Sequence, residues 1–264
     1  MNKYAVLGQH IQYSRSPQIH LASAHYLRLK IEYTILDYSP DDLNRFLTEE
    51  AYFAYSGLNV TTPYKELLAR HFKSPNSSIN TIKIDQNHVQ TYSTDAYGFQ
   101  LALNRVKINL TALKHVYFLG NGGATTALIA FLSQHFPHLK FYVLRRNPEK
   151  DDGFLMMGVK TLNFCPKELQ ACLYNEESSL IVQACLPRAP IAAFMQEIQR
   201  FKGIFFDLNY NQPSLETLAT KLGIRYQAGL PMLLGQAIAA QNIWWGQSAS
   251  FDFLMNELTS KGAL

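Results

Sequence analysis

The chain has 264 residues, of which 47% are apolar, so it can bury a sizeable core, and a disordered chain is excluded. The formal net charge is +4, but no run of five or six basic residues occurs, which argues against nucleic-acid binding and suits small anionic ligands. Three cysteines without metal-ligand spacing, no signal-peptide pattern and no membrane-length apolar run predict reduced thiols and a cytoplasmic location.

The first part of the chain alternates short apolar runs with helical patterns. Strands are expected at 4–7 and 33–36, with a helix from Pro17 to about Leu29 between them. Ser16 stands before a proline, as an N-cap does, whereas Ser14 has no such structural explanation. Two hydroxyls beside a helix N-terminus also favour a carboxylate-binding site.

The segment 59–65 begins within a third expected strand at 57–60 and continues into the turn after it. Thr62 is expected to cap a helix whose first turn contains Pro63. Thr61 and Lys65 would then lie at the mouth of a sheet, where α/β proteins bind ligands. A lysine there can hold an anion or exchange a proton with a substrate oxygen, and a solvated lysine is the alternative interpretation.

A β-hairpin is expected next, with its turn at Gln86-Asn87 and its second strand at 88–92. A helix from about Tyr97 to Arg105 follows. Two polar residues flank this hairpin: Asn80 is interpreted as a turn residue or a ligand, and Asp95 as a helix N-cap or a catalytic group.

The second part of the chain predicts a dinucleotide-binding βαβ unit. A strand at 115–119 leads into Gly120-Asn121-Gly122-Gly123-Ala124, then a helix at 126–136 and a strand at 141–144. The glycines let backbone amides approach a pyrophosphate at the helix N-terminus. Arg145 and Arg146 end the second strand, where NADP sites place arginine, so NADP is favoured over NAD. Nearby acids at 149, 151 and 152 argue weakly the other way.

Further strands at 180–183 and 203–206, with helices at 190–199 and 214–222, predict a doubly wound parallel sheet and an α/β fold class. A long helix at 232–245 carries Gln236, and a last helix covers 251–260. These two helices are expected to return to the first domain. Gln236 on an apolar helix needs a polar partner if it is buried.

Several motifs in this order and spacing resemble the shikimate dehydrogenase family across nearly the whole chain. They are Ser14-Arg15-Ser16-Pro17, Asn59-Val60-Thr61-x-Pro63-x-Lys65, Ile79-Asn80-Thr81, Thr94-Asp95, Gly120-x-Gly122-Gly123-Ala124 and the segment around Gln236. The resemblance implies NADPH-dependent reduction of 3-dehydroshikimate to shikimate, in the chorismate and aromatic amino-acid pathway. It also implies a substrate domain at 1–96 and 237–264, a Rossmann domain at 97–236, and a cleft between them.

The resemblance assigns a role to each matching position. Lys65 and Asp95 would form the catalytic pair. Substrate would be held by Ser14, Ser16, Thr61, Asn80, Tyr210 and Gln236. The cofactor would be held by Gly120, Asn121, Gly122, Gly123, Ala124, Arg145, Arg146 and Gly229. No metal is expected, the only partners expected are small molecules, and the chain would act as a monomer or homodimer.

Departures from the family pattern cluster on the cofactor side, at 145–147, at 183–188 and at Gly229-Leu230-Pro231-Met232, with Ser93 also differing. Cys185 is interpreted as a small core residue rather than a group that affects nicotinamide placement. Three alternatives stay open: a quinate/shikimate paralogue with relaxed cofactor use, a methylene-tetrahydrofolate dehydrogenase, and a ligand-binding homologue that has lost catalysis. The paired serines and Asn80 do not belong to the second of these patterns.

Overall fold

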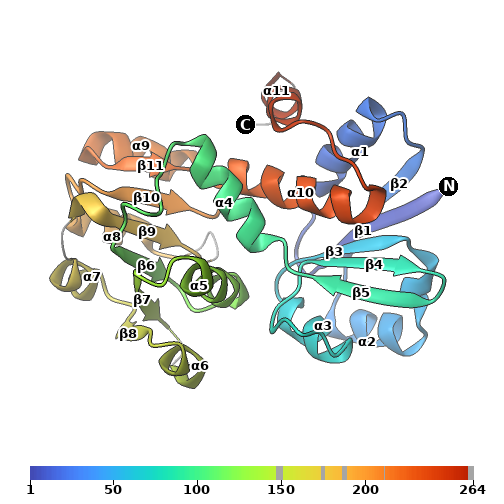
Figure 1. Cartoon of the computed structure of the whole chain (residues 1–264), viewed down its shortest axis with the longest axis horizontal. Helices are drawn as coiled ribbons and strands as arrows, with labels where there is room; N and C mark the ends of the chain where they lie inside the picture. Colours follow the sequence, from blue (N-terminus) through green and yellow to red (C-terminus); the bar gives the residue numbers. More distant parts are fainter. Residues whose placement is uncertain (147–150, 174–175, 186–188, 211, 261–264) are drawn as a thin grey trace. The chain divides into compact units, whose positions relative to one another are not determined.

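The computed structural model describes residues 1–146, 151–173, 176–185, 189–210 and 212–260 (Figure 1). The chain forms two compact units, one of residues 1–99 and 234–264 and the other of residues 100–233. The division falls within two helices, α4 (Asp95–Arg105) and α10 (Leu230–Trp245), which therefore connect the units along the chain. Two sheets and their helices confirm the predicted α/β class.

The first unit is built on a five-stranded sheet with the strand order β2-β1-β3-β4-β5. Its first three strands are parallel, and β4 and β5 run antiparallel to their neighbours, as the expected hairpin requires. The strands are β1 (Asn2–Gly8), β2 (Ile31–Asp37), β3 (Gly57–Val60), β4 (Thr81–Asp85) and β5 (His88–Tyr92).

Helices cover both faces of this sheet, so it has an apolar cluster on each side (Figure 1). One cluster joins the strands to α2 and α3 through Leu43, Phe46 and Leu68. The other joins Tyr4 and Val6 of β1 to Trp244 of α10. The helical segments of the unit are α1 (Ser16–Tyr26), α2 (Pro40–Thr48), η1 (Ala51–Ala54), α3 (Lys65–His71), the second part of α10, and α11 (Phe251–Ser260).

The strand order places a topological switch point between β1 and β3. The connection from β1 leads to β2 on one side, and β3 lies on the other side of β1. In open parallel sheets, ligands bind beyond the carboxyl ends of the strands at such a point. The segments that leave β1 and β3 here are 9–15 and 61–64. They carry two of the expected substrate residues, and Ser16 and Lys65 follow them directly.

The second unit is a six-stranded, fully parallel sheet with the order β11-β10-β9-β6-β7-β8. Counted along the chain, this is the strand order of dinucleotide-binding Rossmann folds, with the switch point between β6 and β9. The strands are β6 (His115–Leu119), β7 (Lys140–Arg145), β8 (Lys160–Asn163), β9 (Ser179–Gln183), β10 (Ile204–Asp207) and β11 (Arg225–Gln227).

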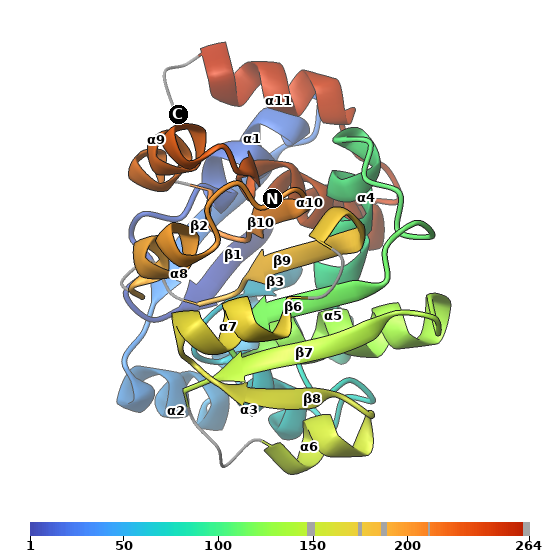
Figure 2. The same cartoon turned by 90° about the vertical axis from the view of Figure 1, so that its left-hand side faces the viewer.

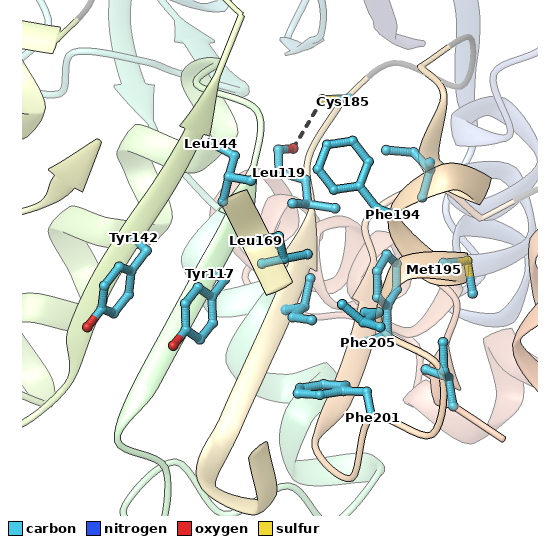
Figure 3. Close-up of a cluster of buried hydrophobic side chains, with 14 of the residues drawn as sticks. Tyr117, Leu119, Tyr142, Leu144, Leu169, Cys185, Phe194, Met195, Phe201 and Phe205 are labelled. Atoms are coloured by element: carbon cyan, nitrogen blue, oxygen red, sulfur yellow. Dashed lines mark hydrogen bonds between the residues drawn. The ribbon is translucent and has the colours of Figure 1, made fainter. Parts of the chain in front are cut away.

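Helices α7 to α9 lie on one side of this sheet and α5 on the other (Figure 2). The core on the α7–α9 side includes Tyr117, Leu169, Phe194 and Phe205, all 1% exposed or less (Figure 3). The remaining helical segments are α5 (Gly123–His135), α6 (Asp151–Met156), α7 (Pro166–Cys172), η3 (Glu176–Ser178), α8 (Ile191–Glu197) and α9 (Pro213–Leu222). Within the described residues, no helix combines the length and the apolar character that a membrane span requires.

Candidate active site

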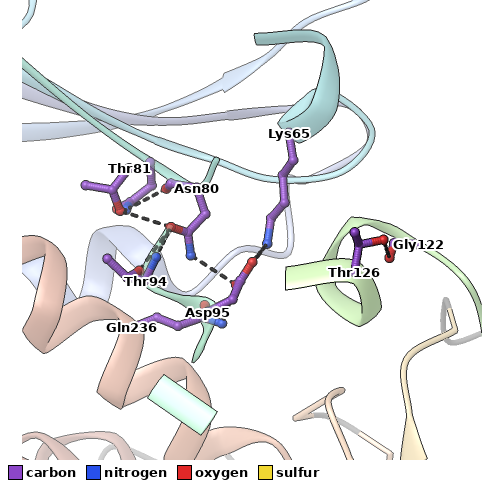
Figure 4. A network of polar contacts seen from close by, with 9 residues as sticks. Lys65, Asn80, Thr81, Thr94, Asp95, Gly122, Thr126 and Gln236 are labelled. Carbon is purple, nitrogen blue, oxygen red and sulfur yellow. Dashed lines mark hydrogen bonds and ion pairs between the residues drawn. The ribbon is translucent and has the colours of Figure 1, made fainter. Parts of the chain in front are cut away.

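Three polar side chains of the first unit contact one carboxylate, that of Asp95 (Figure 4). Lys65 Nζ lies 3.0 Å from Asp95 Oδ1 and 2.7 Å from Oδ2. Asn80 Nδ2 and Gln236 Nε2 donate to Oδ1 at 3.0 and 2.7 Å. The Asp95 side chain is 1% exposed and the Lys65 side chain 17%. The charge of the carboxylate is therefore buried and matched by four donor contacts, while the ammonium keeps some access to solvent.

Asp95 is the first residue of α4, but its side chain does not act as a local helix cap. Its partners come from the start of α3, from the segment before β4 and from α10, which lie 30, 15 and 141 positions away. The N-cap interpretation of Asp95 is therefore wrong. These elements together bring the two expected catalytic side chains into direct contact.

Asn80 is held in one orientation by its neighbours. Its Oδ1 accepts hydrogen bonds from the backbone N–H of Thr94 at 2.7 Å and from the Thr94 hydroxyl at 3.1 Å. The Thr81 hydroxyl also donates to it, at 3.3 Å. Because the oxygen is fixed by donors, the amide nitrogen must point to Asp95. Asn80 is 5% exposed, and its side chain is engaged with Thr81, Thr94 and Asp95.

Lys65 reaches this position through a turn that differs from the predicted helix start. Helix α3 begins at Lys65 with Tyr64 as its N-cap residue, so the prediction that Thr62 caps the helix and Pro63 opens it is wrong. Residues 61–64 form a turn closed by the bond from Tyr64 N to Thr61 O at 3.0 Å, with a cis Thr62–Pro63 peptide. Tyr64 is 3% exposed, and its hydroxyl donates to the Tyr38 carbonyl. Burial of this side chain anchors the turn.

The two expected carboxylate-binding serines lie on one short segment after β1. The Ser14 hydroxyl lies 3.2 Å from that of Ser16 and accepts the Ser16 N–H at 3.3 Å. Helix α1 begins at Ser16, with Arg15 as its N-cap residue and no side-chain cap bond. The N-cap interpretation of Ser16 is therefore wrong, and Ser14, which had no structural explanation, supports the first turn instead.

The segments after β1 and β3 are joined directly. Gln9 N donates to the Thr62 carbonyl at 3.2 Å, and Thr61 N donates to Leu7 O at 2.9 Å. A Cβ atom added at Gly8 would lie 2.6 Å from Thr61 Cγ2 and 2.9 Å from the Thr62 carbonyl oxygen, so only glycine permits this approach. Thr61 is therefore fixed at the carboxyl end of β3.

In the second unit, the glycine-rich turn follows β6 as predicted. Gly120 has a φ of +111°, and Gly122 is the N-cap residue of α5, whose first turn contains Gly123 and Ala124. The first amides of a helix have no partner within it, so they are suited to an anion. A Cβ atom added at Gly122 would meet nothing within 4 Å, so space remains beside this turn. Asn121 lies within the turn and has a contact of its own.

Two arginines stand at the end of β7. Arg145 donates to Asn163 Oδ1 at 3.3 Å. The Arg146 guanidinium carbon lies 5.6 Å from the centre of the Phe164 ring, within cation–π range. A turn of glycines and two cations, at the places where a Rossmann fold holds pyrophosphate and a 2′-phosphate, fits NADP. Residue 147, where the family pattern also departs, lies outside the described residues.

The remaining cofactor-side positions are tightly packed. A Cβ atom added at Gly120 would lie 2.8 Å from Cys185 Sγ, and the thiol donates to the Leu119 carbonyl. Burial raises the pKa of Cys185 to about 11, and the residue belongs to the core, as interpreted from the sequence. A Cβ atom at Gly229 would lie 2.3 Å from the Leu208 carbonyl oxygen. Residues 186–188 of the altered segment lie outside the described residues.

Tyr210 belongs to the second unit, beyond β10. It is the one expected substrate residue outside the first unit. The sequence reasoning did not identify Thr94 as the residue that orients Asn80. Thr94 directly precedes Asp95, the acid that begins α4, and this position could have indicated that Thr94 takes part in the site.

Comparison with known proteins identifies relatives of this chain. Residues 6–83 match the family described as "Shikimate dehydrogenase substrate binding domain". The NADP(+) shikimate dehydrogenase of Clostridium perfringens is 29% identical over 261 residues, 93% of each chain. That of Clostridium beijerinckii is 27% identical over 258 residues, 92% of each chain. The Thermus thermophilus shikimate 5-dehydrogenase, solved with NADP(H) and shikimate, has a TM-score of 0.80 and 27% identity, covering 100% of both chains.

Proposed function

We propose that this chain, a member of the shikimate dehydrogenase family, catalyses the NADPH-dependent reduction of 3-dehydroshikimate to shikimate. One observation carries the proposal. The Lys65 ammonium makes a two-pronged contact with Asp95, and Asn80 and Gln236 converge on the same carboxylate. This set combines a proton donor, an orienting group and two amides suited to hydroxyls. Such a set fits a polyhydroxylated ring acid.

Lys65 is the acid that we assign to the reaction. When bound, NADPH supplies the hydride that reduces the carbonyl carbon. The carbonyl oxygen then becomes negative, and the Lys65 ammonium stabilises it and gives it a proton. Lys65 Nζ contacts both Asp95 oxygens, and an ammonium has three donors, so at least one is left for the substrate oxygen. Because Lys65 is 17% exposed, it can regain a proton from solvent after each turnover.

Asp95 has a different task from that of Lys65. It holds the ammonium by both carboxylate oxygens and so fixes its direction. Its contacts with Asn80 and Gln236 align two further side chains on the same centre. We assign Asp95 to the catalytic pair as the group that orients the acid, and its remaining lone pairs would accept from a ring hydroxyl.

The other substrate contacts follow from the chemistry of the side chains. Ser14 and Ser16 would donate to the ring carboxylate, with Tyr210 as a further donor. Thr61, Asn80 and Gln236 would bind ring hydroxyls, as would Asp95. A site whose polar groups bind a substrate hydroxyl leaves those groups unpaired when the hydroxyl is missing. Such a site rejects the deoxy analogue much more strongly than an apolar pocket rejects an unsuitable ligand. Selectivity for this ring acid over a deoxy analogue is therefore expected to be high.

The cofactor would be held by the second unit. The turn at 120–124 and the first turn of α5 would bind the pyrophosphate, and Gly229, which packs against the backbone of Leu208, would lie beside the cofactor. Arg145 and Arg146 would bind the 2′-phosphate of NADPH through charge-assisted hydrogen bonds. The cytoplasmic location and the monomeric or homodimeric state stay predictions.

The proposal is tested by following nicotinamide absorbance during oxidation of shikimate or quinate with either NADP⁺ or NAD⁺. Turnover of shikimate with NADP⁺ is expected to be the fastest of the four reactions. The Lys65→Met variant should lose this turnover, while the matched Lys30→Met variant, which changes an exposed lysine, should keep it. Faster turnover of quinate with NAD⁺ would favour the paralogue with relaxed cofactor use. Shikimate binding without any turnover would favour the homologue that has lost catalysis.

A further inference from the structure

Two polar residues to which the proposed function gives no role lie at the end of β10 in the second unit. Asp207 is fully buried, and its Oδ1 accepts hydrogen bonds from Asn209 N at 2.8 Å and from Asn209 Nδ2 at 2.9 Å. Its Oδ2 accepts from the Tyr226 hydroxyl of β11 at 2.9 Å. Within the described residues, no lysine or arginine forms an ion pair with this carboxylate. Its charge is therefore matched by the donors of Asn209 and Tyr226.

The Asn209 side chain also reaches the segment that leaves the neighbouring strand. Its Nδ2 donates to the Cys185 carbonyl at 3.1 Å, two residues beyond the end of β9. A carbonyl and a carboxylate can only accept, so the amide nitrogen rather than the amide oxygen must face both. This nitrogen has two hydrogens, which is enough for the two acceptors. Asn209 therefore bridges the segments that follow β9 and β10.

Further bonds complete this arrangement. The Asn209 carbonyl accepts the Gly229 N–H at 3.0 Å, in the segment between β11 and α10. Gln183, the last residue of β9, is fully buried and closes on Cys185. Its Nε2 donates to the Cys185 carbonyl at 3.2 Å, and its Oε1 accepts the Cys185 N–H. Gln183 and Cys185 belong to the segment that departs from the family pattern, so this chain holds the altered segment with bonds of its own.

The three joined segments lie where a Rossmann fold holds the nicotinamide half of its cofactor. Such a fold consists of two mononucleotide-binding halves that meet at the switch point, here between β6 and β9. Arg145 and Arg146 at the end of β7 assign the adenosine half to β6, β7 and β8. The nicotinamide half therefore belongs to β9, β10 and β11, and Asn209 connects the segments that leave these strands.

We propose that Asn209 is a positioning residue that holds the segments after β9 and β10 in the arrangement that receives the nicotinamide ring of NADPH. The inference rests on the proposed function for the identity of this cofactor. A segment that is held before the ligand arrives need not be ordered when the ligand binds, which favours affinity. The adenosine half has its own strands and its own arginines. Loss of the Asn209 side chain should therefore weaken the binding of the nicotinamide half selectively.

The test compares Asn209→Ala with Tyr226→Phe, since each variant removes one side-chain donor from the Asp207 carboxylate. Asn209→Ala also releases the Cys185 carbonyl, which Tyr226→Phe leaves in place. In Asn209→Ala, the Kd for NADPH should rise about tenfold. The Kd for adenosine 2′,5′-bisphosphate, which lacks the nicotinamide, should change less than about twofold. Tyr226→Phe should change both values less than about twofold. Calorimetry measures both ligands without turnover.

A second readout follows the nicotinamide ring itself, because the dihydronicotinamide of NADPH is fluorescent. With the protein in saturating excess, the fluorescence anisotropy of NADPH should be lower in Asn209→Ala than in the wild type or Tyr226→Phe, since a loosely held ring moves more freely. If Asn209→Ala does not fold, Asn209→Ser replaces it in both measurements. A serine has a single, shorter donor, so it can serve Asp207 but cannot bridge both acceptors.

A wild type that binds NADPH but does not oxidise shikimate would contradict the proposed function, and the binding measurements would still decide the inference. The inference is overturned if Asn209→Ala weakens the binding of both ligands equally, or if it changes neither Kd and leaves the anisotropy the same. An equal effect of Tyr226→Phe would overturn it too, because the cause would then be the loss of a donor to Asp207. A wild type that does not bind NADPH has the same consequence.

Discussion

The buried imidazole of His20 makes the stability of the first unit depend on pH. Burial lowers the pKa of His20 from 6.5 to about 3, because a charged ring would lose its hydration among Tyr33, Trp244 and Trp245. The folded protein therefore keeps the ring neutral at pH values where the unfolded chain binds a proton. The resulting loss of stability begins as the pH falls through about 6.5 and continues to about 3.

The magnitude follows from the two pKa values. At about pH 5 the unfolded-state value lies about 1.5 units above the solution pH, and each unit corresponds to about 1.36 kcal/mol. His20 should therefore lower the free energy of unfolding by about 2 kcal/mol between about pH 7.5 and about pH 5. Other groups also titrate in this range, so the quantity to measure is a difference between variants.

The assay is urea unfolding followed by tryptophan fluorescence. The chain has two tryptophans, Trp244 and Trp245, both in the part of α10 that belongs to the first unit, so the signal reports that unit. His20→Asn removes the titrating ring, and His88→Asn does the same at an exposed site. The destabilisation caused by His20→Asn should be about 2 kcal/mol smaller at about pH 5 than at about pH 7.5. His88→Asn should show no such change.

The reasoning would be refuted by a direct titration. Carbon-13 chemical shifts of the His20 ring should stay constant in the folded protein from about pH 8 to about pH 5. A midpoint near 6.5 would show that the folded protein accepts the proton without cost. An equal penalty for His20→Asn at both pH values would lead to the same conclusion.

Three further variants test separate parts of the molecule. Lys65→Met should lower kcat at least about 100-fold while calorimetry still detects shikimate binding, and near-normal turnover would remove Lys65 from its role. Arg146→Ala should raise the KM for NADP⁺ about tenfold and leave the KM for shikimate unchanged, and equal effects on both would contradict a phosphate contact. Gly229→Ala should destabilise the second unit by about 3 kcal/mol, because the added Cβ would lie 2.3 Å from Leu208 O. Thermal unfolding followed by circular dichroism measures this loss, and an unchanged melting curve would show that the chain relaxes there.

Three Ser/Thr-Pro pairs show where sequence patterns identify a helix start and where they fail. The pattern Ser39-Pro40-Asp41-Asp42 is typical of a helix start, and α2 does begin at Pro40, where Asp42 completes a capping box with Ser39. Ser16-Pro17 and Thr62-Pro63 also combine a hydroxyl residue with proline, but Ile19 and Lys65 occupy the position of that acid. Neither side chain can accept the N-cap backbone N–H, so the start of each helix is set by its surroundings.

The strands that the sequence did not reveal are β8 and β11, the two edges of the second sheet. Their residues are half-buried or exposed, so they lack the continuous apolar run that marks a strand covered on both faces. The inner strands β6, β9 and β10 are almost fully buried and were predicted within one residue at each end. Short helices α6 and α7 were missed for a related reason, since six or seven residues give little helical periodicity.

Within the site, the residue types could be named from the sequence, but their assembly could not. Nothing in the spacing of Lys65, Asn80 and Gln236 shows that all three donate to one oxygen of Asp95. The donors meet at Asp95 because of the lengths of β3 and β4 and the place of α10 in the first unit, and the sequence does not give these. The structural alternatives considered for Asp95 and Asn80 were a helix cap and a turn, and both depend only on neighbours in the chain. A contact with a residue distant in the sequence was not among them.

The division of work between Lys65 and Asp95 follows from how fully each side chain is engaged. Asp95 is 1% exposed and accepts four contacts, three of them at Oδ1, so a proton on that oxygen would have to displace a donor from Lys65, Asn80 or Gln236. A proton on Oδ2 would displace the Lys65 ammonium or take the position left for a ring hydroxyl. Displacing a donor inside a buried network leaves a polar group unsatisfied, which costs about 1–3 kcal/mol. Lys65 carries its hydrogens already and is partly exposed, so it can release one and recover it from water without rearranging its partners. Lys65 therefore donates the proton to the substrate oxygen, and Asp95 stays charged and orients the Lys65 ammonium.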